Sequence, residues 1–200
     1  MNTEPIESLA RLKEQFRKLP GIGARSAERL AFHVLREPRD FAAALSAAIL
    51  DVKDRVIHCK TCFNLTEANP CAICSNARRD HSEIWVVEQP KDLIVLEATG
   101  LVHGVYHVLM GHIAPLDGID PEHLTIDALL RRVREGSIRE VILALNPTLE
   151  GDGTALHIQS LLADLDVSVT RPARGLAVGS QIEYASLSML ESAIRGRTPI

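Results

Sequence analysis

Aromatic side chains are scarce in this sequence, which has four Phe, two Tyr and one Trp among 200 residues. So few rings argue against an extended platform on which successive nucleic-acid bases stack. The sequence also lacks a Gly-x-x-x-x-Gly-Lys-Ser/Thr loop, so we do not expect it to hydrolyse a nucleoside triphosphate. No stretch approaches the ~18 apolar residues of a membrane span, and Met1 does not open a basic segment followed by an apolar run. We therefore expect a globular protein of the cytoplasm.

Positive charge is also in short supply, because 22 Lys and Arg stand against 26 Asp and Glu, for a net charge of −4. Taken alone, this balance argues against a nucleic-acid binder. The charge is unevenly distributed, however: residues 1–80 have 13 basic and 10 acidic side chains, whereas residues 81–200 have 9 and 16. We expect an anion to bind the first part of the chain and a basic partner to bind the second.

Cysteine occurs only four times, and all four residues fall between positions 59 and 74. They form two Cys-x-x-Cys pairs, Cys59 with Cys62 and Cys71 with Cys74, separated by eight residues. Two such pairs can place four thiolates tetrahedrally around one zinc ion. The alternatives are two disulfides or redox-active dithiols, but thiols stay reduced in the cytoplasm and a redox centre needs only one pair. We therefore predict one structural zinc ion, with no open coordination position for catalysis.

Residues 1–56 contain three segments in which apolar side chains recur every three or four positions, which predicts three helices. The first helix is expected to end at Pro20, and the third to begin near Asp40. We expect the apolar stripes of all three helices to pack in a core. The stripes consist of Ile6, Leu9, Leu12, Phe16 and Leu19; Ala27, Leu30, Ala31, Val34 and Leu35; and Phe41, Leu45, Ala48, Ile49, Val52 and Val56.

The turn between the first two helices reads Leu-Pro-Gly-Ile-Gly. Its glycines, Gly21 and Gly23, permit a tight reversal and let backbone N–H groups approach an anion at the start of the second helix. Three basic side chains surround this point: Lys18, Arg25 and Arg29. The segment resembles a helix-hairpin-helix, a motif that binds the DNA backbone through its phosphates without reading sequence. The alternative is an ordinary helical hairpin with solvated basic residues, and we favour contact with nucleic acid.

From residue 82 onward, apolar strands alternate with helices. This alternation predicts an α/β domain with a parallel sheet covered by helices on both faces. The predicted strands are 83–87, 106–110, 140–145 and 167–170, and the predicted helices are 92–99, 124–134 and 154–165. Sites in such sheets lie beyond the carboxyl ends of the strands. Glu88 stands at one of these ends, and a loop over 146–153 with Glu150 and Asp152 stands at another.

Glu88 and the later acidic loop resemble a Toprim domain, the α/β module of topoisomerases, primases and some nucleases. In catalytic members this loop has an Asp-x-Asp pair and a Glu-Gly-Glu segment, whose carboxylates bind magnesium. The pair is replaced here by Asn146 and Thr148. Both replacements are neutral, so we expect no Toprim catalysis. Glu150 and Asp152 remain acidic, which leaves weak metal binding open.

The order of helix-hairpin-helix, four cysteines and Toprim resembles the RecR family of bacterial recombination mediators along nearly the whole chain. Further matching segments are Val86-Val-Glu88, Tyr106-His-Val-Leu109, Pro115-Leu-Asp-Gly118 and Glu140-Val-Ile-Leu-Ala144. The match loosens at Ala177-Val-Gly-Ser180, where the family has Pro-Val-Gly-Gly. The resemblance implies four parts: a helix-hairpin-helix DNA-binding region (1–56), a C4 zinc finger (57–80), a Toprim domain (81–176) and a C-terminal oligomerisation segment (177–200).

The same resemblance implies a role in DNA repair and recombination. A family member binds DNA and acts with RecO, and in some settings RecF, to promote loading of RecA onto single-stranded DNA covered by the single-strand binding protein SSB. It has no catalysis of its own, forms homo-oligomeric rings and associates with the nucleoid. We assign DNA contacts to Lys18, Gly21, Gly23, Arg25 and Arg29, and RecO contacts to Glu88, Glu150 and Asp152. The alternatives are a Toprim-type metal-dependent nuclease or primase, and a zinc adaptor that never meets DNA.

Overall fold

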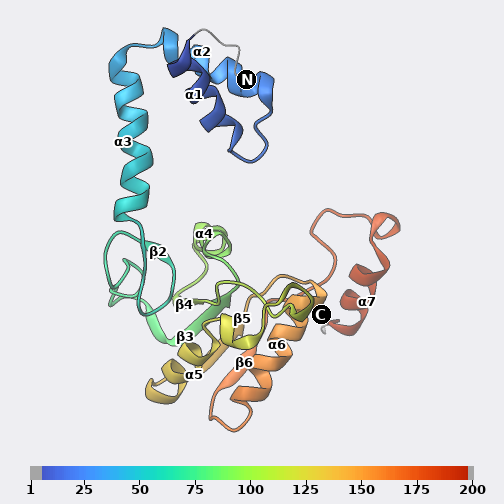
Figure 1. Cartoon of the computed structure of the whole chain (residues 1–200). Coiled ribbons are helices and arrows are strands. Elements are labelled where there is room, and N and C mark those ends of the chain that lie inside the picture. The colour runs from blue at the N-terminus through green and yellow to red at the C-terminus, as the bar shows by residue number, and fades with distance from the viewer. Residues whose placement is uncertain (1–5, 198–200) are drawn as a thin grey trace. The chain divides into compact units, whose positions relative to one another are not determined.

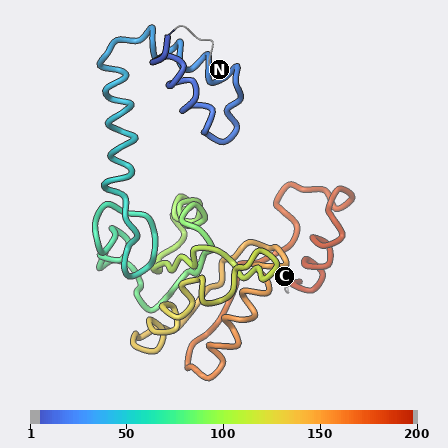
Figure 2. Tube along the Cα trace, in the orientation of Figure 1, coloured from blue at the N-terminus to red at the C-terminus, as the bar shows by residue number. Residues whose placement is uncertain are grey.

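The computed structural model describes residues 6–197 and divides into two compact units, Met1–Val56 and Ile57–Ile200. Figure 1 shows the helical first unit in blue to cyan and the α/β second unit from teal to red, and Figure 2 traces the same chain. Within the described residues, no helix combines the length and apolar character needed to cross a membrane.

The first unit consists of α1 (Glu7–Arg17), α2 (Ala24–Arg36) and α3 (Arg39–Arg55). Helix α1 packs against α2, where Ala27 and Ala31 lie one turn apart and are fully buried. Such small side chains allow the two helix backbones to approach closely. Leu9 and Ala10 of α1 are also buried. The predicted helical hairpin is therefore present, with a core made mostly of small side chains.

Helix α3 departs from the sequence prediction, because none of its residues is buried. Ile49 and Val52, which we expected in the core, have about 60% of their surface exposed. Leu35 of α2 is also exposed, as are Ile6 and Leu19 at the ends of the first stripe. Periodicity identifies the apolar face of a helix, but it does not say whether the same chain supplies the surface that covers it. Here the three helices instead border an open apolar hollow of about 480 Å³, lined by Leu12, Phe16, Leu19, Val34, Leu45 and Ile49, among others.

The second unit begins with the cysteine segment, in which β1 (Ile57–His58) pairs antiparallel with β2 (Leu65–Thr66). A four-stranded sheet follows, made of β3 (Asp80–Val87), β4 (Gly104–Val108), β5 (Glu140–Leu143) and β6 (Ser168–Thr170). The strand order is β4-β3-β5-β6, and every neighbouring pair is parallel. The predicted α/β class with a parallel sheet is confirmed.

Helices cover both faces of this sheet. On one face, Ile84 and Val141 pack beneath α5 (Ile126–Glu135) and α6 (Leu149–Leu162). On the other, Val87 and Tyr106 pack beneath α4 (Pro90–Ala98), together with side chains of the cysteine segment. Each fully buried aliphatic side chain stabilises the fold by roughly 1.5–3 kcal/mol. This two-sided burial explains why the strands appear in the sequence as unbroken apolar runs.

The connections contain short 3-10 helices, η1 (Pro115–Asp117) and η2 (Pro121–His123), before α5. Beyond the sheet the chain continues into η3 (Ile182–Tyr184) and α7 (Leu187–Arg195). Ser186 caps the start of α7, because its hydroxyl accepts a hydrogen bond from the N–H of Met189 at 3.3 Å. No residue of α7 is buried. Large apolar side chains are exposed throughout this last segment: Val178, Ile182, Tyr184, Leu187 and Ile194.

The acidic segment after β5 is helical rather than a loop, because α6 begins at Leu149 and not near Thr154. Thr148 caps it by accepting a hydrogen bond from the N–H of Gly151 at 3.1 Å. Gly151 permits close packing in this turn, because an added Cβ would lie only 2.1 Å from the carbonyl oxygen of Asn146. Glu150 and Asp152 therefore lie in the first turn of a helix, where acidic side chains complement the helix dipole.

Candidate metal centre and nucleic-acid interface

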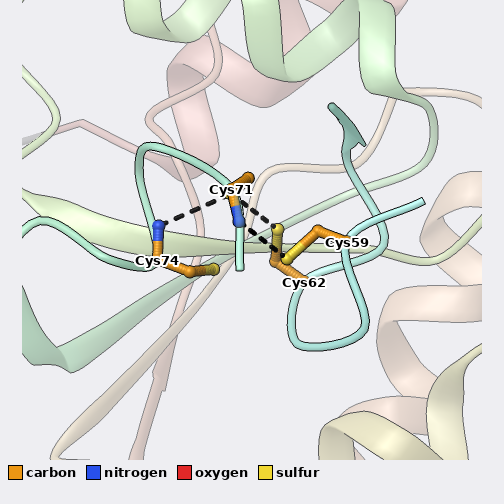
Figure 3. A group of neighbouring side chains, drawn as sticks. All are labelled: Cys59, Cys62, Cys71 and Cys74. Carbon is orange, nitrogen blue, oxygen red and sulfur yellow. Dashed lines mark hydrogen bonds between the residues drawn. The ribbon is translucent and has the colours of Figure 1, made fainter. Parts of the chain in front are cut away.

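The four cysteines converge in the second unit, as Figure 3 shows. Their sulfur atoms all lie within 4.8 Å of one another, and the Sγ atoms of Cys62 and Cys71 are 3.5 Å apart. A tetrahedral zinc site places sulfur atoms about 3.8 Å apart, because each Zn–S bond is about 2.3 Å long. All four thiols are free, so the alternative pairing into two disulfides is not formed here. The spacing fits a single ion.

Backbone groups hold the sulfur atoms in place. The N–H of Cys71 donates to Sγ of Cys59 at 3.4 Å, and the N–H of Cys74 donates to Sγ of Cys71 at 3.5 Å. Each pair closes in a tight turn, because Phe63 N–H donates to the Cys59 carbonyl and Ser75 N–H to the Cys71 carbonyl. Such N–H···S contacts favour thiolate over thiol.

Electrostatics in the cluster also favour a bound cation. The hydrogen bond from the Cys74 thiol is the main cause that lowers the pKa of Cys62 to about 5. That same hydrogen bond raises the pKa of Cys74, and burial raises that of Cys71. Neighbouring thiolates repel one another, so all four can ionise only beside positive charge. A closed set of four sulfur ligands, three of them buried, suits zinc, which would supply structural stability and leave no position for water.

The predicted DNA-binding residues meet at the junction of α1 and α2. Lys18 follows the last turn of α1, Gly21 has a φ of +78°, and Gly23 precedes the first residue of α2. The positive φ of Gly21 allows the reversal that a residue with a side chain would resist. Arg25 and Arg29 project from α2 one turn apart, and all five positions are exposed.

The start of α2 is open to an anion. No side chain caps this helix, since the residue before it is Gly23. The first N–H groups of a helix have no partner within the helix, and together with its dipole they attract phosphate. With Lys18 and Arg25 beside it, this end of the hairpin combines backbone donors and cationic side chains, as the sequence led us to expect.

Sequence reasoning overlooked two residues of the same surface. Arg36 and His33 line a hollow of about 660 Å³ together with Arg25 and Arg29. At 100° per residue, positions 25, 29 and 36 fall within a narrow sector of a helix. The helical spacing of Arg36 could therefore have identified it.

The acidic residues at the carboxyl edge of the sheet do not form one open face. Glu88 is only 3% exposed, and its carboxylate accepts a hydrogen bond from the N–H of Asn146 at 2.7 Å and contacts Nδ1 of His112 at 3.0 Å. Glu150, by contrast, is exposed. Glu88 thus anchors the segment that leads into α6, and a partner could not reach it without displacing those contacts.

Asp152 is engaged by basic side chains. Its carboxylate lies 2.7 Å from Arg174 and 3.9 Å from Arg171. The hydrogen bond from Arg174 is the main reason that the pKa of Asp152 is lowered. Among residues 6–197, the four cysteines are the only group of three or more potential ligand side chains that lie close enough to share an ion.

These features define a class of zinc-containing, DNA-associated proteins. They are a four-cysteine zinc centre, a basic helical hairpin and a parallel sheet that resembles a Toprim domain. Comparison with known families agrees with this assignment. Residues 9–53 match the helix-hairpin-helix family of RecR, residues 56–76 match the four-cysteine zinc finger domain of RecR, and residues 82–173 match the Toprim domain.

Similar proteins match this chain along nearly their whole length. The Recombination protein RecR of Rhodopirellula baltica is 52% identical over 93% of this chain and 94% of its own. Its counterparts in Desulforudis audaxviator and Heliobacterium modesticaldum are 49% and 46% identical, each over 96% of this chain and 98% and 96% of their own. The chain belongs to the RecR family of recombination proteins. It is a protein of DNA recombination and repair with one zinc site formed by its four cysteines.

Proposed function

We propose that this protein is a non-catalytic mediator that binds DNA and acts with RecO, and in some settings RecF, to promote loading of RecA onto SSB-coated single-stranded DNA. The proposal rests on one observation. The chain combines an exposed basic hairpin with a Toprim sheet in which Asn146 and Thr148 replace the Asp-x-Asp pair of catalytic members. The basic hairpin is suited to bind phosphates, whereas the sheet lacks the Asp pair that would bind magnesium for cleavage of phosphodiester bonds.

We divide this function among four segments. Residues 1–56 bind DNA, 57–80 form the zinc finger, 81–176 form the Toprim domain, and 177–200 join subunits. Residues 1–5 and 198–200 lie outside the described residues. In this proposal Arg36 extends the phosphate-binding surface along α2, because it lines the same hollow as Arg25 and Arg29.

The subunits associate into a homo-oligomer in this proposal. The apolar side of α3 and the side chains of the C-terminal segment are exposed, and monomeric proteins rarely leave large apolar patches in water. Each hairpin offers only a few phosphate contacts. Several copies on one DNA molecule increase affinity through effective concentration, which compensates for the low net charge of the chain.

The absence of catalysis is directly testable. We expect the purified protein to leave radiolabelled single-stranded and double-stranded DNA intact during incubation with magnesium or manganese, and not to extend primers with nucleoside triphosphates. The physical reason is that Asn146 and Thr148 are poor ligands for a hard divalent cation. Electrophoresis of the products measures the outcome. Cleavage or synthesis that copurifies with the protein and disappears in Glu150→Ala would favour the nuclease or primase alternative.

The RecO contact is assigned to Glu150 and Asp152 at the start of α6, with Glu88 as the residue that anchors this segment from inside. We expect Glu150→Lys to weaken RecO capture in a pull-down by about tenfold or more, since a charge reversal replaces attraction by repulsion toward a basic partner. The matched control is Glu135→Lys. Glu135 is exposed in the last turn of α5, a helix that runs back toward the amino ends of the strands.

If the wild-type protein and Glu150→Lys capture RecO equally well, the assignment of the RecO contact to the start of α6 is wrong. Equal weakening in Glu135→Lys would show a general effect of net charge and no specific contact at α6.

A further inference from the structure

The first cysteine pair is attached to the edge of the sheet. Strand β4 is an edge strand, and its Val108 N–H donates to the carbonyl oxygen of Cys62 at 2.8 Å. Phe63, which follows Cys62, makes an edge contact with the ring of His107, and the two ring centroids are 5.3 Å apart. The metal centre and the edge strand are therefore in direct contact.

His107 connects this edge to α5. It is fully buried, and its Nε2 lies 3.0 Å from the carbonyl oxygen of Thr125 and 2.9 Å from the hydroxyl of that residue. Its Nδ1 lies 3.2 Å from Nη1 of Arg132. Because a guanidinium has only donors, Nδ1 must accept and Nε2 must carry the proton. Burial, followed by the charge of Arg132, lowers the pKa of His107 to about 3, so the ring is neutral.

Arg132 is held at this position by β4. Its Nη1 donates to the carbonyl oxygen of Tyr106 at 2.8 Å, in addition to the contact with His107. Within residues 6–197, no carboxylate lies at ion-pair distance from this guanidinium. A partly buried cation without a carboxylate partner is costly unless another negative group compensates it.

Contacts through His107 and Phe63 connect this guanidinium to the cysteine segment, whose sulfurs supply negative charge. Burial lowers the pKa of Arg132, whereas the charges of all four cysteine sulfurs, Cys74 first, act in the opposite direction. One zinc ion and four thiolates have a net charge of about −2, because the ion neutralises only half of the thiolate charge.

We propose that Arg132 is the counter-charge of the zinc–thiolate centre, held in place by Tyr106 and the neutral ring of His107, and that it slows the loss of zinc. Arg132 is a positioning and charge-compensating residue and is not a ligand. This role is independent of the proposed contacts with DNA and RecO, because it concerns metal retention alone.

The test separates the effect of the charge of Arg132 from the effect of its hydrogen bonds, and it uses the full chain purified with zinc. Arg132→Gln removes the charge but keeps an N–H donor, whereas Arg132→Lys keeps the charge without the planar guanidinium. Arg131→Gln is the control, because Arg131 is the exposed neighbour on the same helix. Zinc release is followed with a chromogenic chelator. We expect Arg132→Gln to lose zinc about tenfold faster than wild type, Arg132→Lys to remain within about threefold, and Arg131→Gln to be unchanged.

A second readout separates charge from packing. In protein loaded with Co²⁺, the thiolate-to-metal charge-transfer bands are expected to shift in Arg132→Gln and to return toward the wild-type position in Arg132→Lys. Arg132→Met serves as a second neutral variant if Arg132→Gln does not fold. The proposal is overturned if the neutral variants retain zinc as wild type does. It is also overturned if Arg132→Lys releases zinc as fast as Arg132→Gln, since contacts rather than charge would then be responsible.

Discussion

Cys71→Ser is expected to lose the bound zinc and to lower the midpoint of thermal unfolding by at least about 10 °C. Cys71 is buried, its sulfur lies 3.5 Å from that of Cys62, and its carbonyl closes the second turn. A hydroxyl there is a poor zinc ligand, and the remaining three thiolates cannot complete the closed site. The consequence extends beyond the metal, because Phe63 and Ile73 of the cysteine segment pack in the core beneath α4.

Zinc content by atomic emission and unfolding by circular dichroism measure this effect. Ala72→Ser is the matched control, since it adds the same hydroxyl between Cys71 and Cys74 at an exposed position. The control is expected to retain one zinc ion per chain and the wild-type midpoint. Treatment of wild-type protein with a chelator should reproduce the instability of Cys71→Ser. Wild-type stability in Cys71→Ser would mean that the four sulfurs do not act as one structural centre.

Combined substitution of Lys18, Arg25 and Arg29 by alanine is expected to abolish retention of DNA at physiological salt, with a loss of affinity of at least about 100-fold. These three exposed cations lie near the uncapped start of α2 in the sequence, where we expect both charge and backbone donors to attract phosphate. Each phosphate contact releases counterions, so the slope of log affinity against log salt should fall by up to about 3.

Fluorescence anisotropy with labelled oligonucleotides over a series of salt concentrations checks this prediction. The matched control replaces Lys91, Arg131 and Arg134 by alanine, which removes the same total charge at exposed positions of the second unit. A similar loss in the control would mean that the effect follows net charge alone. If the wild-type protein does not bind DNA at any salt concentration, the zinc-adaptor alternative would be favoured instead.

The α/β class was predictable because its signal is local. Strands such as Ile84 to Val87 are buried on both faces and so appear as continuous apolar runs, and the helices between them have their own periodicity. The zinc site was predictable for a similar reason, because two Cys-x-x-Cys turns bring sulfurs together through short segments of backbone. The DNA-binding assignment stays a prediction, although the five residues do lie together at one exposed turn.

The start of α6 could not be predicted in the same way. We predicted a loop over 146–153, and this stretch contains Gly151 and Gly153, which disfavour a helix when no other contact intervenes. The helix forms there since Thr148 caps it and the absence of a side chain at Gly151 permits close approach to Asn146. Both contacts involve the path of the chain after β5, which neighbouring residues in the sequence do not reveal.

Residue order alone specifies the local units, namely the glycine turn between two helices, the paired cysteines, and the apolar strands of a parallel sheet. Which side chains a partner can reach depends on how these units pack. The tertiary structure buries Glu88 against Asn146, leaves the apolar side of α3 uncovered, and brings Arg132 to the edge strand that supports the zinc centre. The physical reason is that periodicity and spacing describe one segment at a time, whereas burial and charge compensation depend on segments that meet only after folding.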